Sequence, residues 1–265
     1  GPIVRYTTVA EEIDERHESV SEFSAGAVRF LFGLGKKMLL ANAVARIADA
    51  AFAAVMPSVL FAWLGAVAYT FQIYFDFSAY SDMAIGLGRM FGFHFLENFN
   101  YPYVARSVTE FWRRWHISLS TWFRDYVYIP LGGNRCSRAR NVWNLFVVWF
   151  LTGMWHGASW NFIAWGLWFF VLLVGEKFLW GKALERLPSL VRHAYAMVLV
   201  VFSWVLFRAE TLTAAAAYFA AMFGSSGVWC GSRVVYYALE FWPELLCCCI
   251  AALPVKQWLE TALQK

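Results

Sequence analysis

The sequence predicts an all-α protein whose helices cross a membrane several times. Of the 265 residues, 60% are hydrophobic, 20% are aromatic and only 15% are charged, whereas a soluble domain usually carries about 25% charged residues. Three long segments, 50–75, 141–175 and 211–232, contain no Asp, Glu, Lys or Arg. About 20 apolar residues suffice for one helical crossing. Because these runs are continuous rather than alternating in period two, they favour helices over a closed barrel.

The first 25 residues do not resemble a membrane helix. They contain six carboxylates against two arginines, and the chain starts at Gly1-Pro2 with neither an initiator Met nor a signal peptide. We expect a water-exposed segment between membrane helices. We therefore interpret the chain as a fragment of a longer protein.

Residues 26–48 have apolar side chains at helical spacing together with Lys36, Lys37 and Arg46. This pattern is typical of a helix at the membrane interface, whose cations reach the lipid headgroups. The first predicted span, 50–75, follows directly.

Polar residues interrupt the lipid-like character of residues 74–95, where Asp76 and Asp82 occur among serines and tyrosines. We expect this segment at one edge of the membrane. Its glycines Gly86, Gly88 and Gly92 allow helices to pack closely.

A helix is predicted to begin at the S-x-x-E capping box formed by Ser107 and Glu110. Seven apolar residues then form one stripe at helical spacing, and three polar residues follow the neighbouring face. The stripe contains Val108, Phe111, Trp112, Trp115, Leu119, Trp122 and Phe123, and the polar face contains Arg113, His116 and Ser120. The sequence PLGGN at 130–134 ends the element with a turn.

Residues 106–140 contain seven arginines and two acids, a net charge of +5. The positive-inside rule places this segment on the cytoplasmic side. The same charges also suit a surface that only holds anionic lipid headgroups.

Residues 141–175 are long enough for one crossing with length to spare, or for two segments joined within the membrane. The stretch LTGMWHGASWN at 151–161 favours a break, because small and polar residues surround His156. Irregular backbone at membrane depth is tolerated only beside protein or a water-filled cavity. Further along, 211–232 can cross once, while 194–207 and 245–255 cross only by recruiting flanking residues.

Two histidines are candidates for chemistry. An ionisable residue inside a membrane indicates a functional site, and burial favours the neutral imidazole of His156, which can accept a proton. His116 lies beside Arg113, which also favours its neutral form. The structural alternatives are a His156 bonded to a neighbouring helix and a His116 carried by an otherwise amphipathic helix. We interpret His17, His94 and His193 as ordinary side chains.

No metal centre is predicted. The five cysteines are Cys136, Cys230 and the run 247–249. They have no nearby His and no ligand spacing, so we interpret them as small apolar residues. No Walker A loop, G-x-S-x-G elbow or H-E-x-x-H pair occurs, and we predict neither a bound cofactor nor a nucleic-acid partner.

Three stretches resemble the membrane-bound O-acyltransferase family, most strongly its members that acetylate alginate. They are QIYFDFSAYSDMAIGLGRMFGF, NFNYPYVARSVTEFWRRWHISLSTWFRDYVYIPLGGNR and LTGMWHGASWNFIAWG. The resemblance implies a polytopic helical fold, with interfacial and broken helices, around a tunnel. It further implies that residues 1–265 are the central part of a single membrane domain, with further helices before it and a further region after it. It also implies that His156 matches the family's essential histidine and His116 a second functional one. Departures occur at Ala79, His94 and Leu96, where relatives often have Gly, Arg and Pro.

The same resemblance implies transfer of an acetyl group from a thioester such as acetyl-CoA to hydroxyls of an exported polysaccharide. It implies secreted or periplasmic acetyltransferase partners and a bacterial inner-membrane location. We expect His156 to act as general base and Trp155, with Trp160, to exclude water. Asn161 is a candidate donor to the oxyanion or the acceptor.

We expect Arg113 and His116, with Ser120 on the same face, to line the approach for a phosphate-bearing donor. Other interpretations remain open at this point: D-alanyl transfer to teichoic acid, a conduit that makes no bonds, and a structural scaffold.

Overall fold

The computed structural model describes residues 2–263, except for the side chains at positions 256, 259 and 262. Every regular element in that part of the chain is a helix, which confirms the predicted all-α class. The α-helices are α1 (Tyr6–Glu15), α2 (Val20–Gly35), α3 (Asn42–Phe52), α4 (Val59–Met90), α5 (Val108–Arg114), α6 (Ile117–Phe123), α7 (Arg138–His156), α8 (Trp160–Gly175), α9 (Gly181–Glu185), α10 (Ser189–Arg208), α11 (Leu212–Met222), α12 (Ser232–Glu240), α13 (Trp242–Ala251) and α14 (Val255–Leu263).

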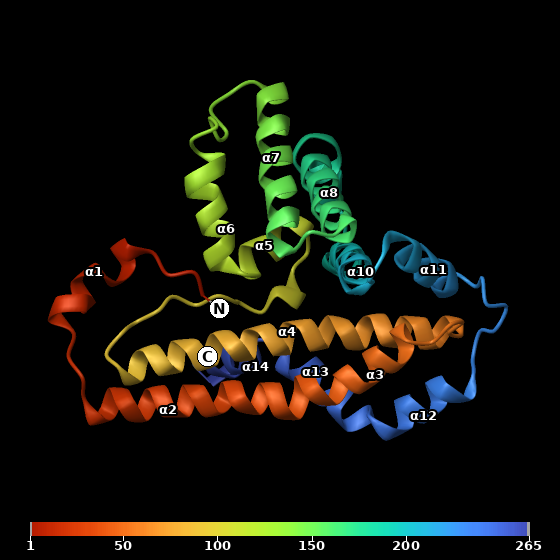
Figure 1. The fold of residues 1–265 in the computed structure, drawn as a ribbon, viewed down its shortest axis with the longest axis horizontal. Helices are drawn as coiled ribbons and strands as arrows, with labels where there is room; N and C mark the ends of the chain where they lie inside the picture. Colours follow the sequence, from red (N-terminus) through yellow and green to blue (C-terminus); the bar gives the residue numbers. More distant parts are fainter. Residues whose placement is uncertain (1, 264–265) are drawn as a thin grey trace.

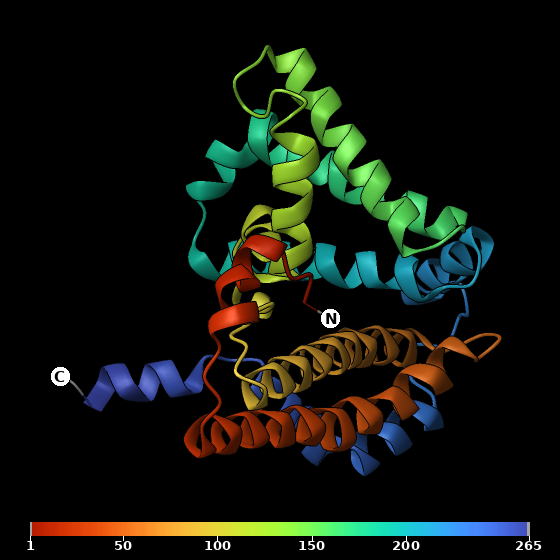
Figure 2. The same cartoon turned by 60° about the vertical axis from the view of Figure 1, so that its left-hand side comes forward.

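The helices form two groups, which Figures 1 and 2 show one above the other. In the lower group α4 lies beside α2 and α3. In the upper group α6, α7 and α8 rise away from α4. Helix α10 connects the groups, because it contacts α4, α5 and α8. The largest cluster of buried side chains contains residues of α3, α4, α5, α8 and α10, so the core lies where the two groups meet.

Glycines allow α2 and α4 to run antiparallel in close contact. A Cβ atom on Gly26 would lie 2.5 Å from the carbonyl oxygen of Gly86, and one on Gly86 would lie 2.6 Å from that of Gly26. Only hydrogen fits between the two backbones at this distance. The close packing predicted for Gly86 is therefore confirmed, with α2 as its partner.

The lysines of residues 26–48 form ion pairs within the protein. Lys36 and Lys37 lie in the π-helical turn η1 (Lys36–Ala41), which joins α2 to α3. Lys36 binds Asp82 at 2.5 Å and Lys37 binds Asp76, both on α4. These ammonium groups neutralise carboxylates on a neighbouring helix, a role that the sequence pattern did not predict. Arg46 lies over the ring of Phe241 instead, 4.9 Å from its centroid.

Three helices are long and apolar enough to cross a membrane: α4, the segment Trp160–Glu185 that begins with α8, and α10. Helices α12 and α13 would form a fourth crossing if counted as one span, and they meet at a bend of 63°. The run 194–207 lies within α10, which adds flanking residues on both sides. Most of 245–255 lies in α13, which α12 lengthens if the bent pair is one span.

Two predicted spans have different bounds in the structure. The run 50–75 is divided, because α3 ends at Phe52 and α4 starts at Val59 and continues to Met90. The polar residues from Asp76 to Asp82 thus lie inside the long helix, where ion pairs with η1 and α2 compensate the acids. The prediction that 211–232 crosses once is wrong, since α11 has only 11 residues and turns follow it.

The uncharged run 141–175 forms two helices, as the break around His156 predicted. Helix α7 ends at His156 and α8 begins at Trp160. Gly157 has φ 155°, a backbone conformation that favours glycine and turns the chain between the helices. The turn leaves His156 at the end of α7, close to the start of α8.

Candidate active site

The helix predicted from Ser107 to Phe123 is broken at its centre. Its start is as predicted, because the Ser107 hydroxyl accepts a hydrogen bond from the amide of Glu110 at 2.9 Å. However, α5 ends at Arg114 and α6 starts at Ile117. His116, between them, adopts left-handed backbone angles, φ 44° and ψ 55°. This conformation costs a non-glycine residue roughly 1–2 kcal/mol, so surrounding contacts must hold it.

The break brings His116 to the same cavity as His156. This cavity, here called the histidine cavity, has a volume of about 310 Å³ and is lined mostly by apolar and aromatic side chains. Its residues come from α4, from α5 and α6, from the end of α7, and from α8 and α10. They are Ile73, Asp76, Phe77, Trp112, Trp115, His116, Leu119, Trp155, His156, Trp165, Trp204 and Phe207.

His116 is almost completely buried, with 2% of its surface exposed. Its ring meets Phe77 edge-on, with 4.6 Å between centroids, and its Nε2 has no hydrogen-bond partner among the described residues. It lies outside the three candidate spans. Burial, and to a smaller extent the nearby His156, lowers the pKa of His116 to about 3. The ring is therefore a neutral imidazole at pH 7.

His156 is half-buried among aromatic rings. The centroid of its imidazole is 4.9 Å from that of Trp155, 4.9 Å from that of Trp165 and 5.0 Å from that of Phe207. No hydrogen bond ties its ring to another described side chain, so the predicted alternative of a structural His bonded to a neighbouring helix has no support here. An imidazole in this setting can exchange a proton with a bound molecule.

Asp76 was not among the predicted site residues, yet it is the carboxylate that lines the histidine cavity. It lies on α4 with Ile73 and Phe77, at the i, i+3, i+4 spacing that defines one helix face. Its carboxylate pairs with the ammonium of Lys37. Helical spacing could have assigned Asp76 to the face of Phe77, but the sequence did not reveal that this face meets His116.

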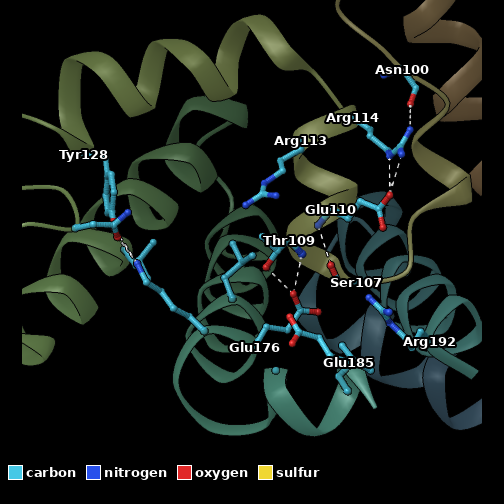
Figure 3. A pocket seen from close by; sticks show the side chains of 16 residues that line it. Asn100, Ser107, Thr109, Glu110, Arg113, Arg114, Tyr128, Glu176, Glu185 and Arg192 are labelled. Atoms are coloured by element: carbon cyan, nitrogen blue, oxygen red, sulfur yellow. Dashed lines mark hydrogen bonds and ion pairs between the residues drawn. The ribbon is translucent and has the colours of Figure 1, made fainter. Parts of the chain in front are cut away.

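A second, larger cavity has many polar and charged residues in its lining. This basin has a volume of about 900 Å³, and Figure 3 shows the side chains that line it. Its cations are Arg113, Arg114, Lys177 and Arg192. Arg114 pairs with Glu110, and Lys177 binds Tyr128 and Asn134. In contrast, Arg113 and Arg192 make no ion pair with any described residue, so both guanidinium groups are free to bind an anion.

A third cavity, the passage, lies between the other two. It has a volume of about 220 Å³ and is mainly apolar. It shares Thr109, Arg113, Tyr128, Leu145 and Leu173 with the basin, and Trp112 and Leu119 with the histidine cavity. Ser120 lines this passage. The passage thus shares a wall with each of the other two cavities, and α5 contributes to both walls.

A buried carboxylate fixes α5 between the cavities. Glu176, the first residue of the π-helical turn η4 (Glu176–Trp180), accepts hydrogen bonds from the amides of Val108 at 2.7 Å and Thr109 at 2.8 Å. It also accepts one from the Thr109 hydroxyl at 2.6 Å. These amides belong to the first turn of α5 and have no partner within the helix. Sequence reasoning missed Glu176, although an acid directly after an apolar run was a visible signal.

The structure brings most predicted site residues to these cavities. His116, His156 and Trp155 line the histidine cavity, Arg113 lines the basin and the passage, and Ser120 lines the passage.

Asn161 and Trp160 lie elsewhere. Asn161 donates a hydrogen bond to the carbonyl of Ala209 at the end of α10, and Trp160 is exposed, so neither lines the histidine cavity. Among the described residues, no group of three or more His, Cys, Asp or Glu side chains could hold a metal ion.

Fold and site together define a multi-span helical membrane protein with two histidines in one aromatic cavity. The chain belongs to the membrane-bound O-acyltransferase family, whose model matches residues 1–216. This agrees with the resemblance carried by the motifs around Asp76, His116 and His156.

Curated relatives refine the position within the family. The chain is 49% identical over 229 residues to the probable alginate O-acetylase AlgI of Pseudomonas aeruginosa, a match that covers 86% of this chain and 44% of that protein. It is 37% identical over 236 residues to the peptidoglycan O-acetyltransferase of Helicobacter pylori, covering 86% and 45%. It is 33% identical over 150 residues to the teichoic acid D-alanyltransferase of Bacillus subtilis, covering 52% and 38%. The chain therefore spans less than half the length of these relatives.

Proposed function

We propose that this chain carries the catalytic part of a bacterial inner-membrane O-acyltransferase. It moves an acetyl group from a thioester donor toward hydroxyls of an exported polysaccharide such as alginate. The observation that supports this proposal most is the histidine cavity, where His116 and His156 from separate elements face one space enclosed by aromatic rings.

In the proposed reaction His156 is the general base. Its neutral ring takes the proton of the acceptor hydroxyl while the oxygen attacks the thioester carbonyl. The C–O bond forms, the C–S bond breaks, and the departing sulfur receives the proton from the imidazolium. Trp155, beside His156, limits the access of water and so suppresses hydrolysis. His116, whose Nε2 has no partner in the part of the chain that the structure describes, is available to hydrogen-bond the reacting groups.

The basin is the proposed entrance for the donor. A thioester such as acetyl-CoA, or an acyl group on a carrier protein, is attached through phosphate groups, and Arg113 and Arg192 can bind them. The acyl chain then follows the passage to the histidine cavity. By the positive-inside rule, the arginines of 106–140 support a cytoplasmic position for this entrance. The three cavities together would form the tunnel that the family resemblance implies.

We infer the transferred group from the relatives and the partner protein from the two sides of the membrane. The acetylases named above match 86% of the chain, whereas the D-alanyltransferase matches 52% at lower identity. This difference favours acetyl over D-alanyl transfer. Because the donor side and an exported polymer lie on opposite faces of the membrane, we also infer a secreted or periplasmic acetyltransferase that receives the group or positions the acceptor.

The test is the acetyl content of exported polysaccharide in cells that express the full-length protein. His156→Ala and His116→Ala are compared at matched membrane abundance, with the exposed His17→Ala as the control. We expect the two cavity variants to abolish or strongly reduce acetylation while polymer export continues, and His17→Ala to behave as wild type. Normal acetylation in His156→Ala refutes the enzyme mechanism. Loss of export with retained acetylation identifies a conduit, and D-alanine on a teichoic acid identifies the other acyl group.

A further inference from the structure

The position of His116 depends on a backbone conformation that its own sequence does not favour. Of the described non-glycine residues, only Tyr101 and His116 have positive φ. The residues around His116 have the pattern of one continuous helix, yet the helix is interrupted there. Strained backbone of this kind persists only when neighbouring groups fix it, and it is common at functional sites.

Those neighbouring groups belong to the loop that follows α4. In a continuous helix the amide of Ser118 would bond to the carbonyl of Arg114. Instead, the Arg114 carbonyl accepts a hydrogen bond from the amide of Asn100 at 2.9 Å, and the amide of Ile117 bonds to the carbonyl of Asn98 at 2.9 Å. The loop therefore replaces the helical bonds on both sides of His116.

The side chain of Asn98 completes this arrangement. Its Oδ1 accepts hydrogen bonds from the amide of Ser118 at 3.1 Å and from the Ser118 hydroxyl at 2.8 Å. Its Nδ2 donates to the hydroxyl of Ser81 on α4 at 3.0 Å. Asn98 has no exposed surface. Because His116, the residue before α6, makes no side-chain cap, Asn98 is the cap of α6 and ties it to α4.

We propose that Asn98 is a positioning residue that holds the imidazole of His116 in the histidine cavity. This inference rests on the proposed function, because it assumes that His116 takes part in acyl transfer. If the cap is lost, Ile117 and Ser118 can return to helical bonding with the preceding turn, and the ring of His116 leaves its place opposite Phe77. His156 and Asp76, the other titratable groups of the cavity, are on α7 and α4 and remain where they are.

The test uses the full-length protein in membrane vesicles, with acetyl transfer from a labelled acetyl thioester measured per molecule from roughly pH 5 to 8. Asn98→Ala is compared with wild type, His116→Ala and the exposed Asn42→Ala. We expect Asn98→Ala to lose at least about tenfold in rate, since it leaves two partly buried donors of Ser118 unpaired. We also expect the acid limb of its pH profile to move upward by about half a unit or more, because the displaced and better hydrated imidazole of His116 regains much of its ordinary pKa of about 6.5, which lies inside the measured pH range.

The pH profile separates positioning from a general loss of folded protein, which lowers the rate without moving the acid limb. Wild-type rates in Asn98→Ala, or a reduced rate with an unchanged acid limb, overturn the inference. If Asn98→Ala does not reach the membrane, Ser118→Ala decides by the same criterion. It removes the hydroxyl that donates to Asn98 and accepts from the amide of Ile3, and it leaves the bond from the Ser118 amide to Asn98 in place. Full activity of His116→Ala would instead refute the role of His116 in the proposed function.

Discussion

The carboxylate of Glu176 offers a test of how α5 is held between the three cavities. Glu176→Gln preserves the shape of the side chain but replaces one acceptor oxygen with an amide group that donates. Glu176→Ala removes all three hydrogen bonds to Val108 and Thr109. The exposed Glu210→Gln is the matched control, since it makes the same chemical change at the surface.

The expected magnitude follows from the contacts. A hydrogen bond to a charged group contributes about 1.5–3 kcal/mol, and an unpaired buried donor costs a similar amount. The carboxylate also interacts favourably with the positive end of the α5 dipole. Glu176 is 8% exposed, so water cannot replace it easily. We expect Glu176→Gln to lower the free energy of unfolding by about 2–3 kcal/mol and Glu176→Ala by about 4–6 kcal/mol.

The assay is thermal unfolding of the detergent-purified full-length protein, followed by acetyl transfer at a temperature where each variant is folded. Both Glu176 variants should unfold at lower temperature than Glu210→Gln. They should also transfer acetyl groups more slowly, because α5 forms the wall shared by the basin and the passage. Unchanged unfolding of Glu176→Ala would refute the role assigned to this carboxylate.

Three further predictions concern packing and charge. Gly26→Ala should destabilise the protein by about 2 kcal/mol or more, because its Cβ would meet the Gly86 carbonyl. Gly35→Ala, whose Cβ would have nothing within 4 Å, should be neutral or stabilise by up to about 1 kcal/mol. Equal unfolding temperatures of the two variants would contradict this packing. Asp82→Asn should cost about 1–3 kcal/mol, because it removes the buried carboxylate shared by Arg29 and Lys36, while Arg29 keeps its pair with Glu97. The exposed Glu18→Gln, at its pair with Arg16, should be neutral in the same unfolding assay, and an equally neutral Asp82→Asn would refute the prediction. The pKa of His116 is lowered to about 3 in the folded protein against about 6.5 when unfolded, so the unfolded state binds more protons below about pH 6.5 and the free energy of unfolding should fall by about 2 kcal/mol by about pH 5. His116→Gln should lack this part of the pH dependence, and an identical pH dependence in both proteins would show that folding does not change the pKa of His116.

The sequence was sufficient for the helical class and for the break at His156. Long uncharged runs identify membrane helices through the cost of burying charge, and Gly157 with its small neighbours marks the end of α7. The bounds of the spans were harder to predict. Asp76 and Asp82 looked like the edge of a membrane segment, but their lysine and arginine partners lie about 40–50 residues earlier in the chain, at Lys36, Lys37 and Arg29. Pairing between distant helices is invisible to local hydropathy.

The break between α5 and α6 shows the same limit at the site. Residues 108–123 follow a helical pattern throughout, and only the loop at 98–100 interrupts the helix at His116. His116 and His156 could be chosen because ionisable rings in apolar surroundings are unusual. That they share one cavity depends on how α5, α7 and α10 meet. Glu176 and Asn98 were missed because their partners, too, are far away in the sequence.

The most direct test of the proposed reaction is acetyl transfer in membrane vesicles that contain the full-length protein, the proposed secreted acetyltransferase and the acceptor polysaccharide. A labelled acetyl thioester is supplied at saturating concentration, and the label on the polysaccharide is measured per molecule of protein. We predict transfer by the wild type and by His17→Ala, and no transfer above background by His156→Gln at equal abundance. Transfer by His156→Gln at the wild-type rate would contradict the assignment of His156 as the general base.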